Sequence, residues 1–274
     1  MYVNRLKRLM IGFGACMALV LAQVAQADTA SPAKPLNLLI VGNSLVYTNN
    51  LPSILTFLAQ SRGLTVDLFA KSGGALSDYV KDGRLQAVIR SHAYDAVIIQ
   101  ERGGDDICVS YPQLSDTPSC KNAVQAHEII ANWAREAGAT PYYLGTYQAT
   151  DESSRTLVKS EKVMAQKMGA RYIEISNTFN ALSARHKSWA WFGKNMHPGY
   201  PLSTLMAIRI YQAVYGAYPS PADVCLDANL FGPGEDIDGY LDHGYLNYKT
   251  APKNCLVGKT QMADMIGLIK QAEK

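Results

Sequence analysis

A serine directly after a buried apolar run is the first residue of this sequence that could do chemistry. The run Leu36–Val41 ends at Gly42, and Ser44 follows within the stretch GNSL. A turn between a buried strand and a helix places a hydroxyl at the mouth of a sheet, where free N–H groups face a developing oxyanion. Ser44 is therefore either a nucleophile or a residue that merely ends a strand. The G-x-S-x-G pattern of the usual α/β-hydrolases is absent around it.

A histidine late in the chain could act as the base for this serine. His197 lies in the loop WFGKNMHPGYP, between an aromatic segment and a helical pattern. Pro198 and Gly199 restrict and bend the backbone beside it, which suits a side chain that must be held in place. A hydroxyl and an imidazole that meet can carry out nucleophilic acyl transfer.

Alternating strand and helix patterns must position these two residues. Short apolar runs bounded by turn residues predict five strands, at Leu36–Val41, Leu64–Ala70, Ala96–Gln100, Tyr142–Tyr147 and Tyr172–Ile175. Helical spacing of apolar residues predicts the helices, between Asn50 and Gly63 and at Arg84–Ser91, Asn122–Glu136, Glu152–Met168, Asn177–Arg185, Pro201–Tyr215 and Gln261–Gln271.

Strands joined by helices of this length imply right-handed crossovers and a parallel sheet covered on both faces. The predicted fold class is α/β, a flavodoxin-like three-layer α/β/α sandwich with a five-stranded parallel sheet. In that architecture the site lies beyond the carboxyl ends of the strands. Ser44, Gly73–Gly74 and Gln100 all fall at or just after such an end.

Four short motifs, found in order at these strand ends, resemble those of the SGNH (GDSL-type) hydrolases. GNSL is similar to the family's first block, which would make Ser44 the nucleophile. SGGAL at Ser72–Leu76 is similar to the second block, in which Gly74 would give its N–H to the oxyanion hole. The resemblance covers roughly residues 36–216.

The two later motifs assign a second oxyanion donor and the base. YDAVIIQERGG at Tyr94–Gly104 is similar to the third block, in the branch with Gln100 instead of Asn as the side-chain donor. NMHPG matches the fifth block, in which His197 would be the general base. The G-x-N-D run that usually ends the third block is absent, because Gly103-Gly104-Asp105 contains no Asn.

The sequence departs from this family at the triad acid. The family places Asp three residues before the histidine, and Lys194 holds that position. A cation there can neither orient the imidazole nor stabilise the imidazolium. Three explanations stay open. A backbone carbonyl or Asn195 orients His197 and leaves a Ser–His dyad, an acid from elsewhere (Asp151 or Asp242) reaches in, or the site only binds.

The first 27 residues have the three-part pattern of a secretory signal peptide: a basic start, the apolar stretch Leu9–Ala22 and a small-x-small cleavage site ending at Ala27. A lipoprotein anchored at Cys16 is the alternative. Cleavage would remove three of the 26 basic residues and leave 23, against 23 acidic residues. A neutral chain without a second long apolar stretch predicts no nucleic-acid and no membrane partner. The signal peptide predicts a periplasmic or secreted location.

Four cysteines follow the signal peptide, and four cysteines allow three pairings. The local pairs Cys108–Cys120 and Cys225–Cys255 are the economical choice, because each closes a loop rich in turn residues. A zinc site is the competing interpretation, and neither a CxxC spacing nor a nearby His pair favours it. We expect no metal and no cofactor.

The remaining chain divides into residues 28–218, which carry the four motifs, and residues 219–274, an extension packed on the same domain and pinned by its disulfide. The segment Glu101–Cys120 is either a lid over the site or an ordinary stapled loop. Several aromatic residues either stack on sugar faces or simply pack, namely Trp189, Trp191, Tyr240, Tyr245 and Tyr248.

These features together predict an exported serine esterase that hydrolyses small acyl esters, in particular O-acetyl groups on a carbohydrate. Two alternatives remain. One is an O-acyltransferase with the same Ser–His pair, and the other is a catalytically silent glycan-binding protein on the same scaffold. A dinucleotide or phosphate role is disfavoured, because no GxGxxG or P-loop follows the first strand.

Overall fold

The computed structural model describes residues 34–273 of the 274-residue chain. The expected signal peptide, residues 1–27, lies outside the described residues, as does Cys16.

The centre of the fold is a six-stranded sheet with the order β5-β4-β3-β1-β2-β7. Its strands are β1 (Leu36–Gly42), β2 (Leu64–Lys71), β3 (Ala96–Ile99), β4 (Thr140–Leu144), β5 (Arg171–Ile173) and β7 (Asp238–Leu241). The first five are parallel, and β7 pairs antiparallel with β2 at one edge. The predicted α/β fold with five parallel strands is confirmed, and the sixth strand is an addition from the C-terminal segment.

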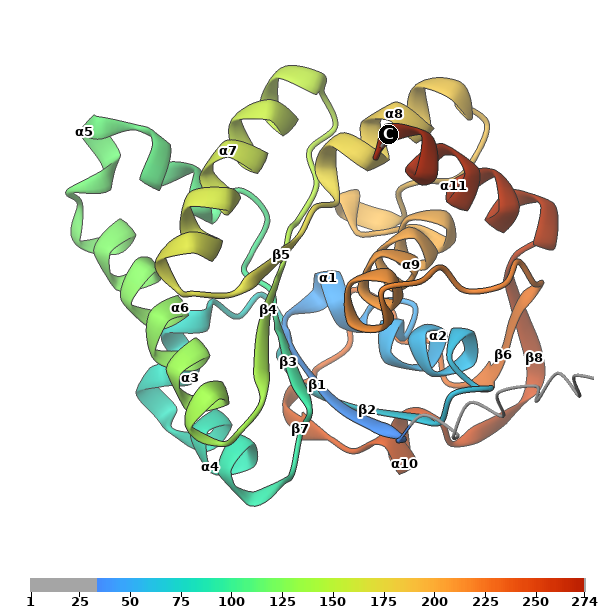
Figure 1. The fold of residues 1–274 in the computed structure, drawn as a ribbon, viewed down its shortest axis with the longest axis horizontal. Helices are drawn as coiled ribbons and strands as arrows, with labels where there is room; N and C mark the ends of the chain where they lie inside the picture. The colour runs from blue at the N-terminus through green and yellow to red at the C-terminus, as the bar shows by residue number, and fades with distance from the viewer. Residues whose placement is uncertain (1–33, 274) are drawn as a thin grey trace, which may run out of the picture. The chain divides into compact units, whose positions relative to one another are not determined.

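Helices cover both faces of this sheet (Figure 1). Two hydrophobic cores form, one on each face, because the strands bury side chains alternately on both sides. The first core packs against α2 (Leu51–Leu58), α8 (Ser176–Arg185), α9 (Tyr200–Tyr215) and α11 (Lys259–Ala272). The second packs against α3 (Leu76–Asp82), α4 (Arg84–Ser91), α6 (Pro118–Glu136) and α7 (Asp151–Lys167).

Local sequence explains where the helices begin and end. The side chain of Asn50 caps α2 by accepting a hydrogen bond from Ser53 N–H, and Pro52 occupies the first turn. Helix α9 ends at Gly216, whose φ of 64° is open to glycine. The predicted helices in these regions agree with the structure to within a few residues, but α3 directly after the SGGAL motif was not anticipated.

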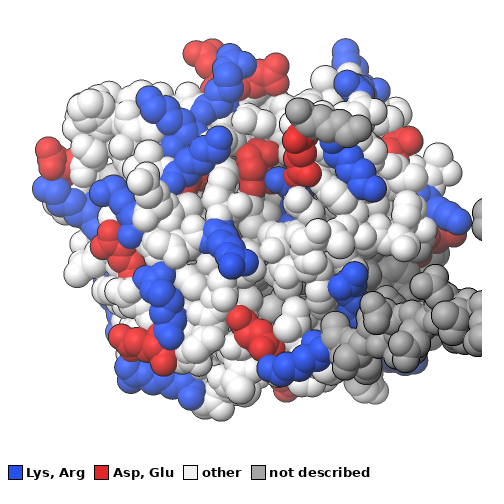
Figure 2. Space-filling model, viewed as in Figure 1, with Lys and Arg blue, Asp and Glu red and all other residues white. Residues whose placement is uncertain are grey.

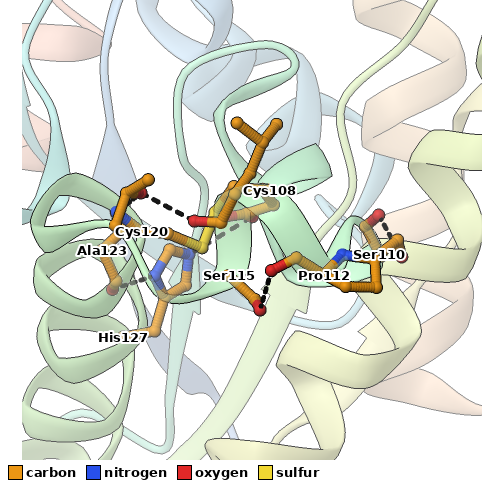
Figure 3. Close-up of a disulfide and its surroundings, with 11 residues drawn as sticks. Cys108, Ser110, Pro112, Ser115, Cys120, Ala123 and His127 are labelled. Atoms are coloured by element: carbon orange, nitrogen blue, oxygen red, sulfur yellow. Dashed lines mark hydrogen bonds and ion pairs between the residues drawn. A yellow bond between two sulfur atoms is a disulfide. The ribbon is translucent and has the colours of Figure 1, made fainter.

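Two disulfides link the described cysteines, in the local pairing that the sequence favours. Cys225–Cys255 joins the antiparallel partners β6 (Val224–Ala228) and β8 (Lys249–Val257). Cys108–Cys120 joins a 3₁₀ turn, η1 (Asp105–Ser110), to α6 (Figure 3). The one-turn helix α5 (Pro112–Ser115) lies between η1 and α6 in the chain.

Asp67 in β2 ties the C-terminal segment to the sheet. Its carboxylate accepts hydrogen bonds from the hydroxyls of Tyr94 and Tyr240 and from the backbone N–H and ring of His243, at 2.7–2.9 Å. Tyr240 belongs to β7, and His243 begins the one-turn helix α10 (His243–Leu246). The division at residue 218/219 into a domain and an extension stays a prediction.

The face of the molecule in Figure 2 carries Lys and Arg interspersed with Asp and Glu, with no large area of one sign. Within residues 34–273, no helix is long and apolar enough to cross a membrane. The same residues contain no group of three or more His, Cys, Asp or Glu side chains that could hold a metal ion.

Candidate active site

Ser44 lies where β1 gives way to a short helix, α1 (Ser44–Tyr47), and its side chain is nearly buried. The preceding Asn43 fixes this turn, because its Oδ1 accepts from Leu45 N–H at 3.1 Å and its Nδ2 donates to the Gly74 carbonyl at 3.2 Å. Gly42 is required before the turn, since a Cβ there would lie 2.5 Å from Gln100 Oε1. Close packing thus sets the position of the hydroxyl.

The Ser44 hydroxyl meets the ring of His197. Ser44 Oγ and His197 Nε2 are 2.9 Å apart, although 153 positions separate the two residues in the chain. On the other side of the ring, Nδ1 lies 3.0 Å from the Lys194 carbonyl oxygen. A carbonyl can only accept a hydrogen bond, so Nδ1 carries the proton and Nε2 is free to accept from the serine. This is the tautomer that a general base needs.

Lys194 therefore offers its backbone, not its side chain, to the histidine. Both ring nitrogens of His197 are taken, by Ser44 Oγ and by this carbonyl. Asp151 lies in the first turn of α7, and Asp242 caps α10 by accepting from Tyr245 N–H. Of the explanations left open for the missing acid, the geometry favours a Ser–His dyad oriented by a backbone carbonyl. Asn195 is near by but makes no hydrogen bond to the ring in the described structure.

The histidine loop is a tight antiparallel turn between Phe192 and Pro198. Gly193 N–H donates to the His197 carbonyl at 2.8 Å, and Gly199 N–H donates to the Trp191 carbonyl at 2.7 Å. A Cβ on Gly199 would collide with the Ala190 carbonyl oxygen, which explains the glycine.

Two residues that sequence reasoning missed clamp this loop. Asn49 Nδ2 donates to the Pro198 carbonyl at 2.7 Å and to Ser203 Oγ at 3.0 Å. The Tyr147 hydroxyl donates to the Met196 carbonyl at 3.0 Å. The usable signal was the pair Asn49-Asn50, two polar residues in an apolar stretch, because both take positive φ values, 62° and 55°, which asparagine tolerates.

The loop itself contains two further residues in the left-handed region. Asn195 has φ 55° and Met196 has φ 61°. Such a conformation costs a non-glycine residue about 1 kcal/mol or more and persists only where the surroundings impose it. Met196 is 52% exposed, so the strain is imposed by the backbone contacts of the loop rather than by side-chain packing.

The two expected oxyanion donors lie differently from their predicted roles. The Gly74 N–H donates to the Lys71 carbonyl at 3.0 Å, so it is already engaged, and Gly73 lines the cavity at Ser44 instead. Gln100 is fully buried; its Oε1 accepts from Asn43 N–H at 3.4 Å, and its Nε2 donates to the Glu101 carbonyl. Gln100 thus lies buried behind the turn at Asn43, and the oxyanion roles of Gly74 and Gln100 stay predictions.

A cavity of about 370 Å³ opens beside Ser44. Its walls come from the carboxyl ends of four strands, and its lining comprises Asn43, Ser44, Leu45, Gly73, Arg102, Gly103, Tyr147, Gln148, Ala149, Asn195 and Met196. The predicted site region at the strand ends thus coincides with an open cavity.

A buried carboxyl supports the cavity wall after β4. Glu161 in α7 accepts from Thr146 N–H at 2.7 Å and from the Tyr172 hydroxyl at 2.6 Å. Burial raises the pKa of Glu161 to about 8, although the Tyr172 hydroxyl opposes this shift. Thr146 immediately precedes Tyr147 and Gln148 of the cavity, so Glu161 holds that segment in place.

A second buried group of charges supports the wall after β3. Glu101 accepts from Arg102 N–H at 2.7 Å and from Leu76 N–H at 3.2 Å, which ties the loops after β2 and β3 together. His127 Nε2 lies 3.5 Å from Asp106 Oδ2, an ion-pair distance that is long for a hydrogen bond. Figure 3 shows this imidazole beside the Cys108–Cys120 disulfide, bonded to the Ala123 carbonyl.

Burial and neighbouring charges shift the pKa values of Glu101 and His127. Burial raises the pKa of Glu101 to about 7, and the positive charge of His127 opposes the shift. Burial disfavours the charged form of His127, but Asp106 and then Glu101 outweigh it and raise the pKa of His127 to about 9. Glu101 of this group bonds the backbone of Arg102, which lines the cavity.

The segment Glu101–Cys120 behaves as a stapled loop. Ser110 Oγ and Ser160 Oγ of α7 are 2.6 Å apart, and the disulfide fixes the other end on α6. Only Arg102 and Gly103, at its start, line the Ser44 cavity. Arg102 pairs with Asp105 at 2.7 Å within the same loop.

Among the aromatic residues singled out from the sequence, Trp191 packs in the core against Phe179, with ring centroids 5.5 Å apart. Tyr240 bonds Asp67 at the sheet edge, and Tyr245 and Tyr248 are exposed. Trp189 alone of this set lines a cavity next to His197.

Comparison with known proteins supports the superfamily resemblance. No protein-family model matches the chain. The rhamnogalacturonan acetylesterase RhgT of Bacillus subtilis (strain 168) is 26% identical over 155 residues, which cover 52% of this chain and 65% of that protein. The chain thus matches a little less than two thirds of the length of this curated relative.

Solved structures share the fold at low sequence identity. The enzyme LAE5 from the metagenome of Lake Arreo, an alpha/beta hydrolase, is 16% identical, with a TM-score of 0.50 over 67% of this chain and 96% of that one. A Parabacteroides merdae structure described as a GDSL-like lipase is 13% identical, with a TM-score of 0.50 over 68% of this chain and 98% of that one.

The fold thus brings Ser44 and His197 within hydrogen-bond distance at the strand ends of an α/β/α sandwich. The chain shares its fold with a structure described as a GDSL-like lipase, in agreement with the resemblance of its motifs to the SGNH (GDSL-type) hydrolases.

Proposed function

We propose that this protein is an exported serine esterase that hydrolyses small acyl esters, in particular O-acetyl groups on a carbohydrate. The observation that carries the proposal is the 2.9 Å contact between Ser44 Oγ and His197 Nε2, with Nδ1 of the same ring on a carbonyl. The similarity to an acetylesterase of a polysaccharide supports the acyl group and the carbohydrate.

The reaction follows from the positions of the donors and acceptors. Ser44 Oγ attacks the ester carbonyl carbon while His197 Nε2 takes the hydroxyl proton. The N–H groups of Ser44 and Gly73 are the proposed donors to the oxyanion, and His197 then returns the proton to the leaving alcohol. Water attacks the acetyl-serine by the same proton path in reverse.

A Ser–His dyad without an acid can still be catalytic, because the Lys194 carbonyl performs one of the two functions that the acid has in a triad. In a Ser–His–Asp triad the acid fixes the tautomer and stabilises the imidazolium, and a wrong tautomer lowers turnover by about 10⁴. The Lys194 carbonyl fixes the tautomer, whereas a neutral group stabilises the imidazolium less than a carboxylate does. We therefore expect a working but modest turnover.

A fluorophosphonate probe tests the proposal directly. The wild-type protein is expected to be labelled at Ser44 and to release acetate from a small acetyl ester. Ser44→Ala should lose both properties with its thermal midpoint nearly unchanged, and the matched control Ser61→Ala, an exposed turn residue, should keep both. Labelling or turnover that survives Ser44→Ala would disprove the serine assignment.

The same experiment separates the esterase from the catalytically silent alternative. One structural argument supports that alternative: among residues 34–273, no acidic side chain bonds His197. A protein that binds glycans but takes up no probe and releases no acetate is the silent binder. Export is tested by N-terminal sequencing of the mature protein, which should begin at Asp28 if cleavage follows Ala27.

A further inference from the structure

Both cysteines of the Cys108–Cys120 disulfide line a cavity of about 300 Å³, which is distinct from the cavity at Ser44. Cys120 is only 2% exposed, whereas Cys108 is partly exposed. A small molecule in this cavity therefore approaches the disulfide from the Cys108 side. The mechanism proposed for Ser44 makes no use of this disulfide.

Cys120 occupies a position that stabilises a thiolate. It lies in the first turn of α6, a helix of 19 residues that begins at Pro118. The free N–H groups at the start of a helix favour a negative charge near by, and a cysteine placed there has a lowered thiol pKa. The side chain of Thr117 accepts from Cys120 N–H at 3.3 Å and holds the residue in this turn. If the disulfide opens, Cys120 is thus the better leaving group.

His127 adds a positive charge on the same side of α6. It follows Cys120 by seven residues, which is two helical turns along one face. Figure 3 shows its imidazole beside the disulfide. Burial lowers the pKa of His127, but Asp106 and Glu101 outweigh burial and raise this pKa to about 9. The ring is therefore charged at neutral pH, where it favours a neighbouring thiolate.

The acidic side chains around the disulfide are mostly paired with cations. Three pairs surround it: Arg102–Asp105 at 2.7 Å, Lys121–Asp116 at 3.1 Å and His127–Asp106 at 3.5 Å. Glu101 accepts from two backbone N–H groups, and burial raises its pKa to about 7. Because Glu101 and Asp105 both line the cavity, it should admit an uncharged thiol more readily than an anionic one.

The Cys225–Cys255 disulfide is a built-in comparison. Both of its cysteines lie in strands, β6 and β8, so neither has a helix N-terminus beside it. Cys255 is exposed and Cys225 is partly exposed. Exposure alone would make this disulfide the first to be reduced. Stability of the leaving thiolate predicts the opposite order, because a thiol with a lower pKa leaves faster.

We propose that Cys108–Cys120 is a site of thiol–disulfide exchange for a small, uncharged dithiol. One thiolate of the dithiol attacks Cys108 Sγ, the bond between the two cysteines breaks, and its electron pair leaves with Cys120 Sγ as a thiolate. The second thiolate of the dithiol attacks the reagent sulfur of this mixed disulfide and displaces the Cys108 thiolate. The dithiol is oxidised to a cyclic disulfide, the two cysteines gain its two electrons, and the dithiol's protons go to solvent, which reprotonates Cys108.

Opening this disulfide should reach the Ser44 cavity through Arg102, which lines both cavities. Arg102 pairs with Asp105, the first residue of η1, and Cys108 ties η1 to α6. Reduction releases η1 from α6 and leaves Arg102 less firmly held. We therefore expect a higher KM for an acetyl ester. This consequence rests on the proposed esterase function, whereas the exchange reaction itself does not.

The order of reduction tests the exchange site in the folded wild-type protein. The protein is incubated with limiting dithiothreitol at pH 7, quenched with acid and alkylated, and the modified cysteines are identified by peptide mass spectrometry. Cys108 and Cys120 should become alkylated at least about tenfold faster than Cys225 and Cys255. Equal rates, or faster reduction of the Cys225–Cys255 disulfide, would overturn the proposal.

The direction of attack is tested with the uncharged monothiol 2-mercaptoethanol, which forms the mixed disulfide but cannot complete the second step. The adduct should be found on Cys108, with Cys120 as the free thiol. An adduct mainly on Cys120 would overturn the assignment of the leaving group.

Two single variants compare the thiols directly. In Cys108→Ser the Cys120 thiol is free, and it should react with iodoacetamide at a lower pH than the Cys108 thiol of the matched variant Cys120→Ser. The reverse order would overturn the stabilisation of the Cys120 thiolate. If either variant fails to fold, the two wild-type measurements still decide.

Kinetics of acetate release test the link to the Ser44 cavity. Selective reduction of Cys108–Cys120 should raise KM, and reoxidation should restore it. Selective reduction of a protein that releases no acetate in either form would leave the exchange site standing and overturn the esterase. Acetate release with the same KM in both forms would overturn the link through Arg102.

Discussion

At the scale of single residues, a backbone carbonyl rather than an acidic side chain bonds the His197 ring. The Lys194 side chain has the wrong charge for a triad, yet its carbonyl lies 3.0 Å from His197 Nδ1 and fixes the ring. Under the proposed mechanism, the side chain at position 194 is therefore free of any part in orienting the ring.

Gly42 is the residue whose replacement should disturb the nucleophile most directly. In Gly42→Ala the new Cβ would lie 2.5 Å from Gln100 Oε1 and 2.8 Å from Val46 Cγ2, both in the buried turn. Overpacking of this kind costs about 1–3 kcal/mol of unfolding free energy, and the displaced turn should lower kcat at least tenfold. Chemical denaturation and acetate release measure the two effects.

Gly267→Ala is the matched control for this prediction. Gly267 lies inside α11, and a Cβ there would meet nothing within 4 Å. Because alanine favours helix over glycine, its unfolding free energy should rise by up to about 1 kcal/mol with kcat unchanged. A Gly42→Ala protein with wild-type stability and turnover would contradict the close packing described for the Ser44 turn.

Glu161 makes stability depend on pH. Its pKa is raised from 4.5 to about 8 in the folded state, so between these values the folded chain binds a proton that the unfolded chain has lost. Unfolding free energy therefore falls as the pH rises from 4.5 to 8 and is constant beyond that window. His127 acts in the same direction between 6.5 and about 9.

Glu161→Gln isolates this contribution, because glutamine resembles the protonated carboxyl at every pH. Denaturant titrations at pH 5 and pH 8.5 should show that the wild type loses at least about 1 kcal/mol more than the variant over this interval. Parallel losses in the two proteins would mean that Glu161 is ionised in the folded state at neutral pH.

At the scale of elements, the histidine loop depends on clamps from distant segments. Tyr147 follows β4 and bonds the Met196 carbonyl at 3.0 Å. In Tyr147→Phe this bond is lost, which should cost about 1 kcal/mol of stability and lower kcat severalfold as the His197 ring loses its fixed position. Acetate-release kinetics and thermal unfolding measure both.

Tyr142→Phe controls for the loss of a hydroxyl as such. Tyr142 lies in β4, and its hydroxyl also donates to a backbone carbonyl, that of Ala213 at 3.4 Å, remote from the site. We expect a loss of stability without a change in kcat. Equal kcat effects in the two variants would show that Tyr147 does not position the loop.

The Cys108–Cys120 disulfide should serve both stability and the site. It closes a loop of sequence separation 12, and its removal should lower the unfolding free energy by about 3 kcal/mol. Because Arg102 and Gly103 of the same segment line the cavity, the double variant Cys108→Ser/Cys120→Ser should also raise KM. Calorimetry and steady-state kinetics provide the two readouts.

The second disulfide is the control for this prediction. Cys225→Ser with Cys255→Ser should destabilise the protein comparably, since it joins β6 to β8, but neither cysteine lines the Ser44 cavity. An equal change of KM in both double variants would refute a specific role of the Cys108–Cys120 disulfide in shaping the Ser44 cavity.

At the scale of the whole molecule, the sequence predicts those parts that follow from local patterns. Short apolar runs mark all five parallel strands. The rule that sites gather at strand ends points to Ser44, whereas His197 is predicted from its loop and from the resemblance of NMHPG to a motif of the SGNH hydrolases. Strand β7 (Asp238–Leu241) escapes prediction because its residues DGYL form no apolar run and become a strand only by pairing with β2. The orientations of the Gly74 N–H and the Gln100 amide could not be predicted either. Short motifs show the order of residues along the chain but not the direction in which an N–H or an amide points.

The place of β7 in the sheet has a consequence for the growing chain. Strand β2 is complete by residue 71, but its open side is paired only when residues 238–241 exist. Until then β2 presents a row of unbonded peptide groups to any extended polypeptide near by. During synthesis, the edge of β2 therefore stays unpaired until residues 238–241 have been made. A chain that ends before residue 238 is expected to self-associate through the unpaired edge of β2.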